Sequence, residues 1–181
     1  FQNLEKISFI AWIPPFKYPT LQQKTEGAEV ISLIAVRENP QIKRTNLPAR
    51  LQADEIKQET GIHEIILVNE DGLITEGSRS NIFFVKNKEV FTPKLELVLP
   101  GITQSKIFEV ATKNNIQVQK IPIKLKDAHT FESAFISSTS NQVLPLKKLD
   151  EINFHSKNQV IETISIGFQK LVQENLAQFS W

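Results

Sequence analysis

The alternation of apolar and polar positions along the chain predicts short strands with three longer helices between them. Continuous apolar runs are typical of buried strands, and apolar residues spaced three or four apart mark one face of a helix. By these criteria we expect strands at 6–15, 28–36, 63–69, 81–85, 89–93, 116–123, 133–138 and 143–149. Helical spacing is found at 47–60, 104–115 and 158–179, with a short helix or turn at 124–132.

Cap residues indicate where these helices begin and end. Asn46 is a suitable N-cap for the first helix, and Gly61 is expected to end it. Leu51 and Ile56 are expected to share one face with Leu47. Thr103 is expected to cap the second helix, because its hydroxyl directly precedes the helical pattern.

The order of the elements predicts a mixed α/β or α+β domain, because strands and helices alternate after residue 46. The polar stretch at 16–27 is interrupted by Pro19 and is expected to be a loop. Residues 1–35 are thus rich in linker sequence and short of helices, and we expect a domain boundary between residues 35 and 36.

Composition fits one domain and excludes several functions. Forty per cent of the 181 residues are hydrophobic, including 12 Phe, which is enough for one core. Lys and Arg total 21 against 20 Asp and Glu, so we expect no nucleic-acid partner. The absence of Cys excludes disulfides and thiolate chemistry. No apolar run approaches the roughly 20 residues that span a bilayer, so we expect no membrane partner and a cytoplasmic location.

The histidines and the short motifs narrow the chemistry further. His63, His129 and His155 lie far apart without an HxH or HxxxH pair, so we expect no metal site. The chain contains no G-x-G-x-x-G or Walker loop and no G-x-S-x-G motif, so neither nucleotide binding nor a hydrolase triad is supported.

Three polar clusters remain, each at a break between predicted elements. They occupy residues 76–81, 99–103 and 137–141. In the last two, hydroxyls and the free N–H groups of a helix start or turn are suited to binding a phosphate. The alternative is that Thr103 only caps a helix and that Ser138 and Thr139 only form a turn.

The first cluster differs because it contains a carboxylate, Glu76. A carboxylate near a phosphate site suits a ligand that also carries a positive group, and the pyridinium of pyridoxal 5'-phosphate (PLP) is such a group. PLP enzymes also need a lysine. Lys43 is the candidate because it follows a short apolar segment and precedes a helix cap; the alternative is an ordinary solvated lysine.

Taken together, these motifs resemble the class IV, or fold-type IV, PLP enzymes. That family comprises D-amino acid aminotransferases, branched-chain aminotransferases and aminodeoxychorismate lyases. The matching segments occur in the family's order from about residue 29 to the C-terminus: IKRTNL at 42–47, ITEGSRSNIF at 74–83, TP at 92–93, LPGIT at 99–103 and FISST at 135–139. The resemblance implies the large domain of the D-amino acid aminotransferase-like fold at 36–181, and the end of the small N-terminal domain with its linker at 1–35.

The resemblance also implies a role for each matching residue. Lys43 would form the Schiff base with PLP and shuttle the proton, and Glu76 would lie at the pyridine nitrogen. The remaining residues would bind the phosphate or shape the wall beneath the ring, namely Ile102, Thr103, Ser138 and Thr139 for the phosphate and Ser80 and Asn81 for the wall.

The sequence departs from the family pattern at two positions near these motifs. Arg often follows GIT in the family, where this chain has Gln104, and a small residue is common where this chain has Arg79. Arg79 is expected either to narrow the pocket or to face solvent. The spacing Lys-x-x-Asn-Leu from Lys43 favours the D-amino acid aminotransferase and lyase branch.

The resemblance implies a PLP-dependent transaminase of small amino acids that works as a homodimer. Two alternatives stay open: a 4-amino-4-deoxychorismate lyase that releases 4-aminobenzoate and pyruvate, and a degenerate, non-catalytic PLP-binding protein. Nothing here matches the family's small domain, and the chain begins at Phe1 and lacks Met. We therefore expect either a fragment of a longer protein or a protein that has lost half of its active site.

Overall fold

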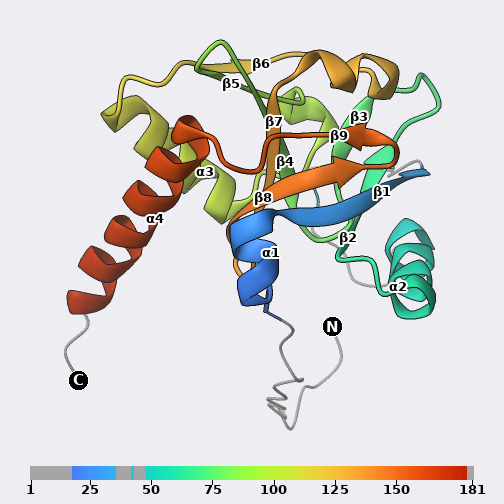
Figure 1. The fold of residues 1–181 in the computed structure, drawn as a ribbon, viewed down its shortest axis with the longest axis horizontal. Helices are drawn as coiled ribbons and strands as arrows, with labels where there is room; N and C mark the ends of the chain where they lie inside the picture. The colour runs from blue at the N-terminus through green and yellow to red at the C-terminus, as the bar shows by residue number, and fades with distance from the viewer. Residues whose placement is uncertain (1–17, 36–41, 43–47, 179–181) are drawn as a thin grey trace, which may run out of the picture.

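The computed structural model describes residues 18–35, 42 and 48–178. Within these ranges the chain forms a curled, nine-stranded mixed sheet with helices against it (Figure 1). The strands are β1 (Ala28–Ile34), β2 (Glu64–Val68), β3 (Ile74–Gly77), β4 (Asn81–Lys86), β5 (Glu89–Thr92), β6 (Val118–Lys120), β7 (Ser133–Ser138), β8 (Gln142–Leu149) and β9 (Ile152–Asn153). The helices are α1 (Leu21–Glu26), α2 (Pro48–Thr60), α3 (Ile102–Lys113) and α4 (Gln159–Ala177), with 3-10 turns η1 (Leu95–Leu97) and η2 (Leu125–Thr130). The predicted mixed α/β class is confirmed.

A short connection accounts for the curl of the sheet. The strand order is β3-β2-β1-β8-β7-β4-β5-β6, with β9 paired to β8, so β3 and β4 are five positions apart. In a flat sheet that separation would be about 24 Å, whereas the connection from Gly77 to Asn81 through residues 78–80 reaches only about 14 Å. The sheet therefore has to curl, and the 78–80 turn lies where its two halves meet.

β1 lies in the middle of this sheet and is paired on both sides. It runs parallel to β2, with Val30 opposite Glu64, and parallel to β8, with Val30 also opposite Leu149. The predicted hairpin at 81–93 is confirmed as β4–β5, and its two turn residues, Asn87 and Lys88, have φ values of 52° and 64°. This left-handed pair is typical of a tight two-residue hairpin turn. The predicted strand at 6–15 lies outside the described residues.

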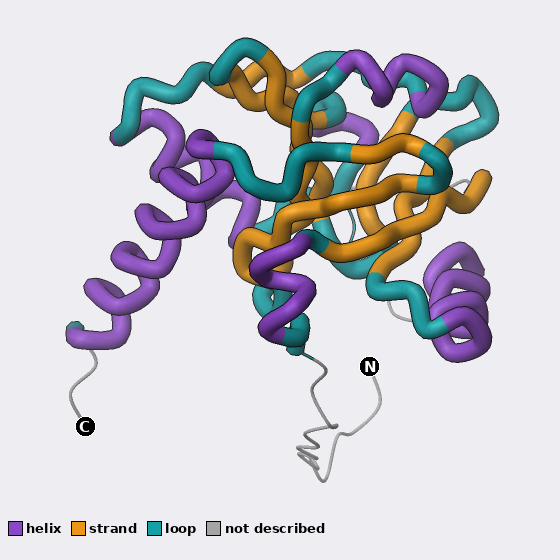
Figure 2. The backbone as a smooth tube through the Cα atoms, viewed as in Figure 1, coloured by secondary structure: helices purple, strands orange, loops and turns teal. Residues whose placement is uncertain are grey.

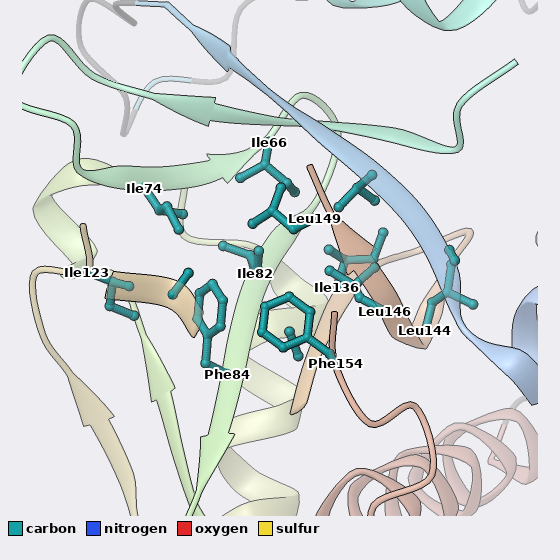
Figure 3. Packing of buried hydrophobic residues seen from close by; sticks show 14 of the residues in the cluster. Ile66, Ile74, Ile82, Phe84, Ile123, Ile136, Leu144, Leu146, Leu149 and Phe154 are labelled. Carbon is teal, nitrogen blue, oxygen red and sulfur yellow. The ribbon is translucent and has the colours of Figure 1, made fainter. Parts of the chain in front are cut away.

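Three apolar clusters pack against the faces of the sheet. The concave side holds Ile66, Ile82, Phe84, Ile136 and Leu144 with their neighbours, as Figure 3 shows. The other side is covered by α3 and α4, which lie side by side, while α2 packs at the opposite flank (Figure 2). The rings of Phe83 and Phe135 stack under α3 and α4 with centroids 4.7 Å apart. Burial on both faces explains why β4 and β7 read as continuous apolar runs.

The expected loop at 16–27 contains a helix instead. α1 covers Leu21–Glu26 and is held by a capping box, in which the Thr20 hydroxyl accepts from the Gln23 N–H at 3.1 Å and the Gln23 side chain accepts from the Thr20 N–H at 2.9 Å. Pro19 precedes this box and does not interrupt it. The prediction was wrong because Pro was taken as a breaker where it only precedes a helix start.

The face of α2 that Leu51 and Ile56 were expected to share is only partly buried, since Ile56 packs against the sheet and Leu51 does not. Leu51 is 50% exposed, and the buried residues are Ala49 and Ala53. Small side chains bring the helix close to β2, and Ala53 packs against Ile65 there. The end of α2 at Gly61 is confirmed, with φ of 73° at that glycine. Asn46 and Leu47 lie outside the described residues.

Candidate functional site

The three polar clusters that the sequence analysis singled out line one cavity. Its volume is about 570 Å³, and its walls are residues 76–81, 99–103 and 137–140, together with Arg50 of α2. The walls come from the end of β3, the start of α3 and the end of β7. The curl of the sheet brings these three segments together although they are far apart in sequence.

Glu76 is the buried acid of the cavity. It lies on β3, is 3% exposed, and its Oε2 accepts a hydrogen bond from the Leu99 N–H at 2.9 Å. The bond to a backbone group fixes the direction of the carboxylate. β3 is itself fixed by its antiparallel pairing with β2, where Gly77 lies opposite Ile66. The structure therefore presents one oriented carboxylate to the cavity.

Helix α3 begins at the cavity wall. Its N-cap is Gly101, without a side-chain hydrogen bond, and not Thr103 as the sequence predicted. The predicted cap was wrong by two positions, because the chain is already helical at Ile102. The first-turn N–H groups of a helix attract anions, and here they stand at a cavity that Thr103 also lines. Thr103 is 9% exposed, whereas the Ile102 side chain is 83% exposed.

Asn81 and Gly101 are fitted to each other beside this helix start. Asn81 Nδ2 donates to the Leu99 carbonyl at 3.0 Å. A Cβ atom on Gly101 would overlap Asn81 Oδ1. A larger residue at position 101 would therefore require the Asn81 amide or the 99–101 segment to shift.

The turn after β7 supplies the hydroxyls of the third wall. The Ser138 hydroxyl accepts from the Asn141 N–H at 3.1 Å and lies 3.2 Å from the Ser140 hydroxyl. Asn141 is in turn 3.0 Å from His63 Nε2. Thr139 is exposed and lines the cavity. Ser138 is thus partly engaged in holding its own turn, while Thr139 stands at the cavity surface.

Ser137 also lines the cavity, although the sequence analysis did not single it out. It is fully buried, and its hydroxyl has no hydrogen-bond partner among the residues that the structure describes. A buried polar group without a partner costs about 1–3 kcal/mol, so this hydroxyl is suited to a ligand. The cluster at 137–141 contained it, but nothing in the sequence distinguished Ser137 from the serine that follows.

Glu64 lies behind the 78–80 turn and was also missed. This buried carboxylate accepts hydrogen bonds from the hydroxyls of Ser78 at 2.6 Å and Ser80 at 3.0 Å. The Ser80 hydroxyl is therefore directed toward Glu64. Glu64 is the second residue of the predicted strand at 63–69 and gave no sign in the sequence that it would be buried.

Arg79 both lines the cavity and faces solvent, since its side chain is 56% exposed. Its guanidinium donates two hydrogen bonds to Asp54 of α2, at 2.5 and 3.3 Å. Burial opposes ionisation of Asp54, but the hydrogen bonds from Arg79 and from Lys57 outweigh it, so the pKa of the Asp54 carboxyl lies below its usual range. The other cavity arginine, Arg50, donates from Nε to the Ser78 carbonyl at 3.2 Å.

Replacing Asp54 with Asn is expected to lower the free energy of unfolding by about 1 kcal/mol at pH 7, a value limited by the exposure of Arg79. A lowered pKa means that the folded state favours the charged carboxylate. The contribution is therefore present above the ordinary pKa of about 4 and is lost as the pH falls below it. Urea unfolding of parent and variant at pH 7 and pH 3 checks this: the difference should shrink at pH 3, and a constant difference would contradict it.

Of the predicted site residues, Glu76, Ser80, Asn81, Ile102, Thr103, Ser138 and Thr139 all line this cavity. Lys43 lies outside the described residues. Among the residues that the structure describes, no group of three or more His, Cys, Asp or Glu is placed to hold a metal ion. Within the same ranges, no helix has the length and apolar character needed to cross a membrane.

Comparison with known proteins identifies the family. The sequence profile of amino-transferase class IV matches residues 10–149, and the chain belongs to this family. The predicted resemblance is thus confirmed. Class IV aminotransferases are PLP-dependent enzymes, and similar structures include one in its PLP form.

Individual relatives agree with this assignment. A D-alanine aminotransferase from Bacillus licheniformis is 31% identical over 110 residues, which cover 60% of this chain and 38% of that protein. Branched-chain-amino-acid aminotransferase-like protein 1 from Arabidopsis thaliana is 27% identical over 172 residues, covering 91% of this chain and 30% of that protein. The crystal structure of the branched-chain amino acid aminotransferase from Escherichia coli matches with a TM-score of 0.72 and 25% identity, covering 81% of this chain and 52% of that one. The chain spans less than half the length of these curated relatives.

Proposed function

We propose that this chain provides the PLP-binding half of a transaminase that acts on small amino acids. The observation that carries the proposal is the cavity itself, where a buried carboxylate and a set of phosphate-type donors lie on different walls. Glu76 is the carboxylate, and Thr103, Ser138 and Thr139 supply hydroxyls beside the start of α3. PLP has the matching pair of groups, a ring nitrogen that can be protonated and a phosphate.

The residues present fit this cofactor. Within the described part of the chain, the Ser137 hydroxyl is buried without a partner and α3 starts without a side-chain cap, so donors are available at the cavity wall. The phosphate would be held by the first-turn N–H groups of α3 with the hydroxyls of Thr103, Ser138 and Thr139. Lys43 would carry the covalent link, as the family motif implies.

Each of these residues would have a distinct task in the reaction. When bound, PLP supplies an electron-withdrawing ring that makes the substrate Cα–H bond more acidic. Glu76 would hold a proton at the ring nitrogen, because a nearby negative charge favours the protonated form. Lys43 would accept and return the substrate proton. Ser80 and Asn81 would shape the wall beneath the ring, and the α3 start would anchor the phosphate against displacement.

The test is an assay of the intact protein that contains this chain. PLP should give a bound absorbance band in the visible region, and D- and L-amino acids with a 2-oxo acid acceptor should reveal amino-group transfer. Formation of 4-aminobenzoate and pyruvate from aminodeoxychorismate, without transamination, would favour the lyase. A bound band without either activity would favour a non-catalytic PLP-binding protein, and no bound band would overturn the proposal. Light scattering of the same sample tests the proposed homodimer.

A further inference from the structure

Glu64 is a buried carboxylate that the proposed function leaves without a task. It opens β2, its side chain is 4% exposed, and it lies behind the cavity wall and not on it. A carboxylate removed from water is unfavourable unless it is hydrogen-bonded and paired with a charge. Its surroundings show what compensates for that burial.

All three residues of the 78–80 turn donate a hydrogen bond to this one carboxylate. The Ser78 hydroxyl donates to Oε1 at 2.6 Å, and the Ser80 hydroxyl and the Arg79 N–H donate to Oε2 at 3.0 and 3.3 Å. The Ile65 N–H adds a fourth bond to Oε1 at 2.9 Å. This turn is the connection that crosses between the two halves of the curled sheet, and it lines the cavity from Ser78 to Ser80.

Charges of alternating sign continue from Glu64 to Arg79, which lines the cavity. Lys57 Nζ lies 3.6 Å from Glu64 Oε1, 3.0 Å from Asp54 Oδ1 and 3.0 Å from the Ser78 hydroxyl. Asp54 then binds the Arg79 guanidinium. Arg79 is thus held at both ends, by Glu64 at its backbone and by Asp54 at its side chain. The 78–80 turn, Glu64, Lys57 and Asp54 therefore form one connected network of hydrogen bonds and ion pairs.

We propose that Glu64 is a positioning residue that fixes the 78–80 turn and, through it, the wall of the cavity. Backbone hydrogen bonds hold the ends of the turn, from the Gly77 N–H to the Ser80 carbonyl at 2.7 Å and from the Ser78 N–H to the Ile65 carbonyl at 2.8 Å. The two serine hydroxyls and the Arg79 N–H depend on Glu64. Without it, the Ser80 hydroxyl is free to turn toward the cavity. The effect on cofactor binding rests on the proposed function, whereas the effect on the turn does not.

The experiment uses Glu64→Gln in the intact protein, with Glu29→Gln as the matched control. Glu29 forms an exposed ion pair with Lys147 and does not line the cavity. Without PLP, Glu64→Gln is expected to speed amide hydrogen exchange in residues 77–81 by tenfold or more, because a neutral amide cannot replace a carboxylate that accepts four bonds. With PLP, it should weaken PLP binding by about tenfold and change the circular dichroism of the PLP bound at saturation. The control should match the parent in amide exchange, in PLP affinity and in the circular dichroism of bound PLP.

A second variant covers the case in which Glu64→Gln does not fold, since Lys57 would then lose one of its two carboxylate neighbours and keep only Asp54. Glu64→Gln combined with Lys57→Met removes both charges, and the same fast exchange at 77–81 is expected. Unchanged exchange there would overturn the proposal. So would unchanged dichroism and affinity for PLP, which would make Glu64 only a stabiliser of the fold. A parent protein that binds no PLP would overturn the proposed function instead, and the exchange measured without PLP would still decide whether Glu64 holds the turn.

Discussion

Changing Glu76 to Gln is expected to slow turnover by about two to three orders of magnitude, the usual size of a lost electrostatic interaction in a transition state. The amide keeps the shape of the side chain and can still accept the hydrogen bond from the Leu99 N–H. It no longer provides the negative charge that holds a proton at the cofactor's ring nitrogen. Because the phosphate-binding wall is unchanged, PLP should still bind, with at most a modest loss of affinity. Steady-state kinetics and a PLP absorbance titration of the same samples check both parts.

Glu109→Gln is the control for this prediction. Glu109 is also a glutamate of the same domain, but it lies on the exposed side of α3 between Lys106 and Lys113. Its loss should leave turnover near that of the parent. If Glu76→Gln turns over as fast as the parent, Glu76 is only a polar residue of β3, and the proposed role of the cavity fails with it.

Gly101→Ala is expected to weaken PLP binding by about tenfold to a hundredfold, which corresponds to roughly 1.4–2.8 kcal/mol. The added methyl group would overlap Asn81 Oδ1. Either Asn81 must leave the Leu99 carbonyl, or the start of α3 must move away from the cavity. Both displace donors that are proposed to hold the phosphate. Fluorescence titration of the protein with PLP measures the change.

Gly167→Ala separates this local effect from a general loss of stability. A methyl group at Gly167 of α4 would overlap Val110 Cγ1 of α3, far from the cavity lining. This variant should melt at a lower temperature and bind PLP as tightly as the parent. Equal losses of affinity in the two glycine variants would mean that Gly101→Ala acts through the fold and not through the helix start.

Most of the fold could be predicted from the sequence because the periodicity was clear. The buried face of α4 follows helical spacing, with Val160, Ile161, Ile164 and Phe168. In the hairpin, burial alternates along β5, whereas β4 is buried along most of its length. Two of the errors concern the starts of α1 and α3, where one residue decides, and a third concerns the buried face of α2. Gly101 caps α3 by its backbone conformation alone, which gives no side-chain signal, so Thr103 was taken as the cap. The N-terminal helix α1 is too short for its periodicity to be recognised.

The site was only partly accessible from the sequence. Glu76, Thr103 and Ser138 stand out because polar residues cluster at strand and helix ends, but their convergence depends on the curl that the 78–80 turn imposes. Glu64 could not be found, because a charged residue at the start of a strand is normally solvated. Its burial arises only when the turn folds back over β2. A residue such as Glu64, which supports the cavity wall from behind, produces no recognisable pattern in the sequence.

The most direct test of the account is to find which lysine the cofactor binds. Borohydride reduction of the PLP-loaded intact protein, followed by peptide mapping, should place the pyridoxyl label on Lys43, in the segment IKRTNL. The Lys43→Ala variant should give no label there, and Lys57→Met, which removes a lysine beside the cavity, should label as the parent does. A label on a lysine other than Lys43, or no label on a protein that has PLP bound, would contradict the account.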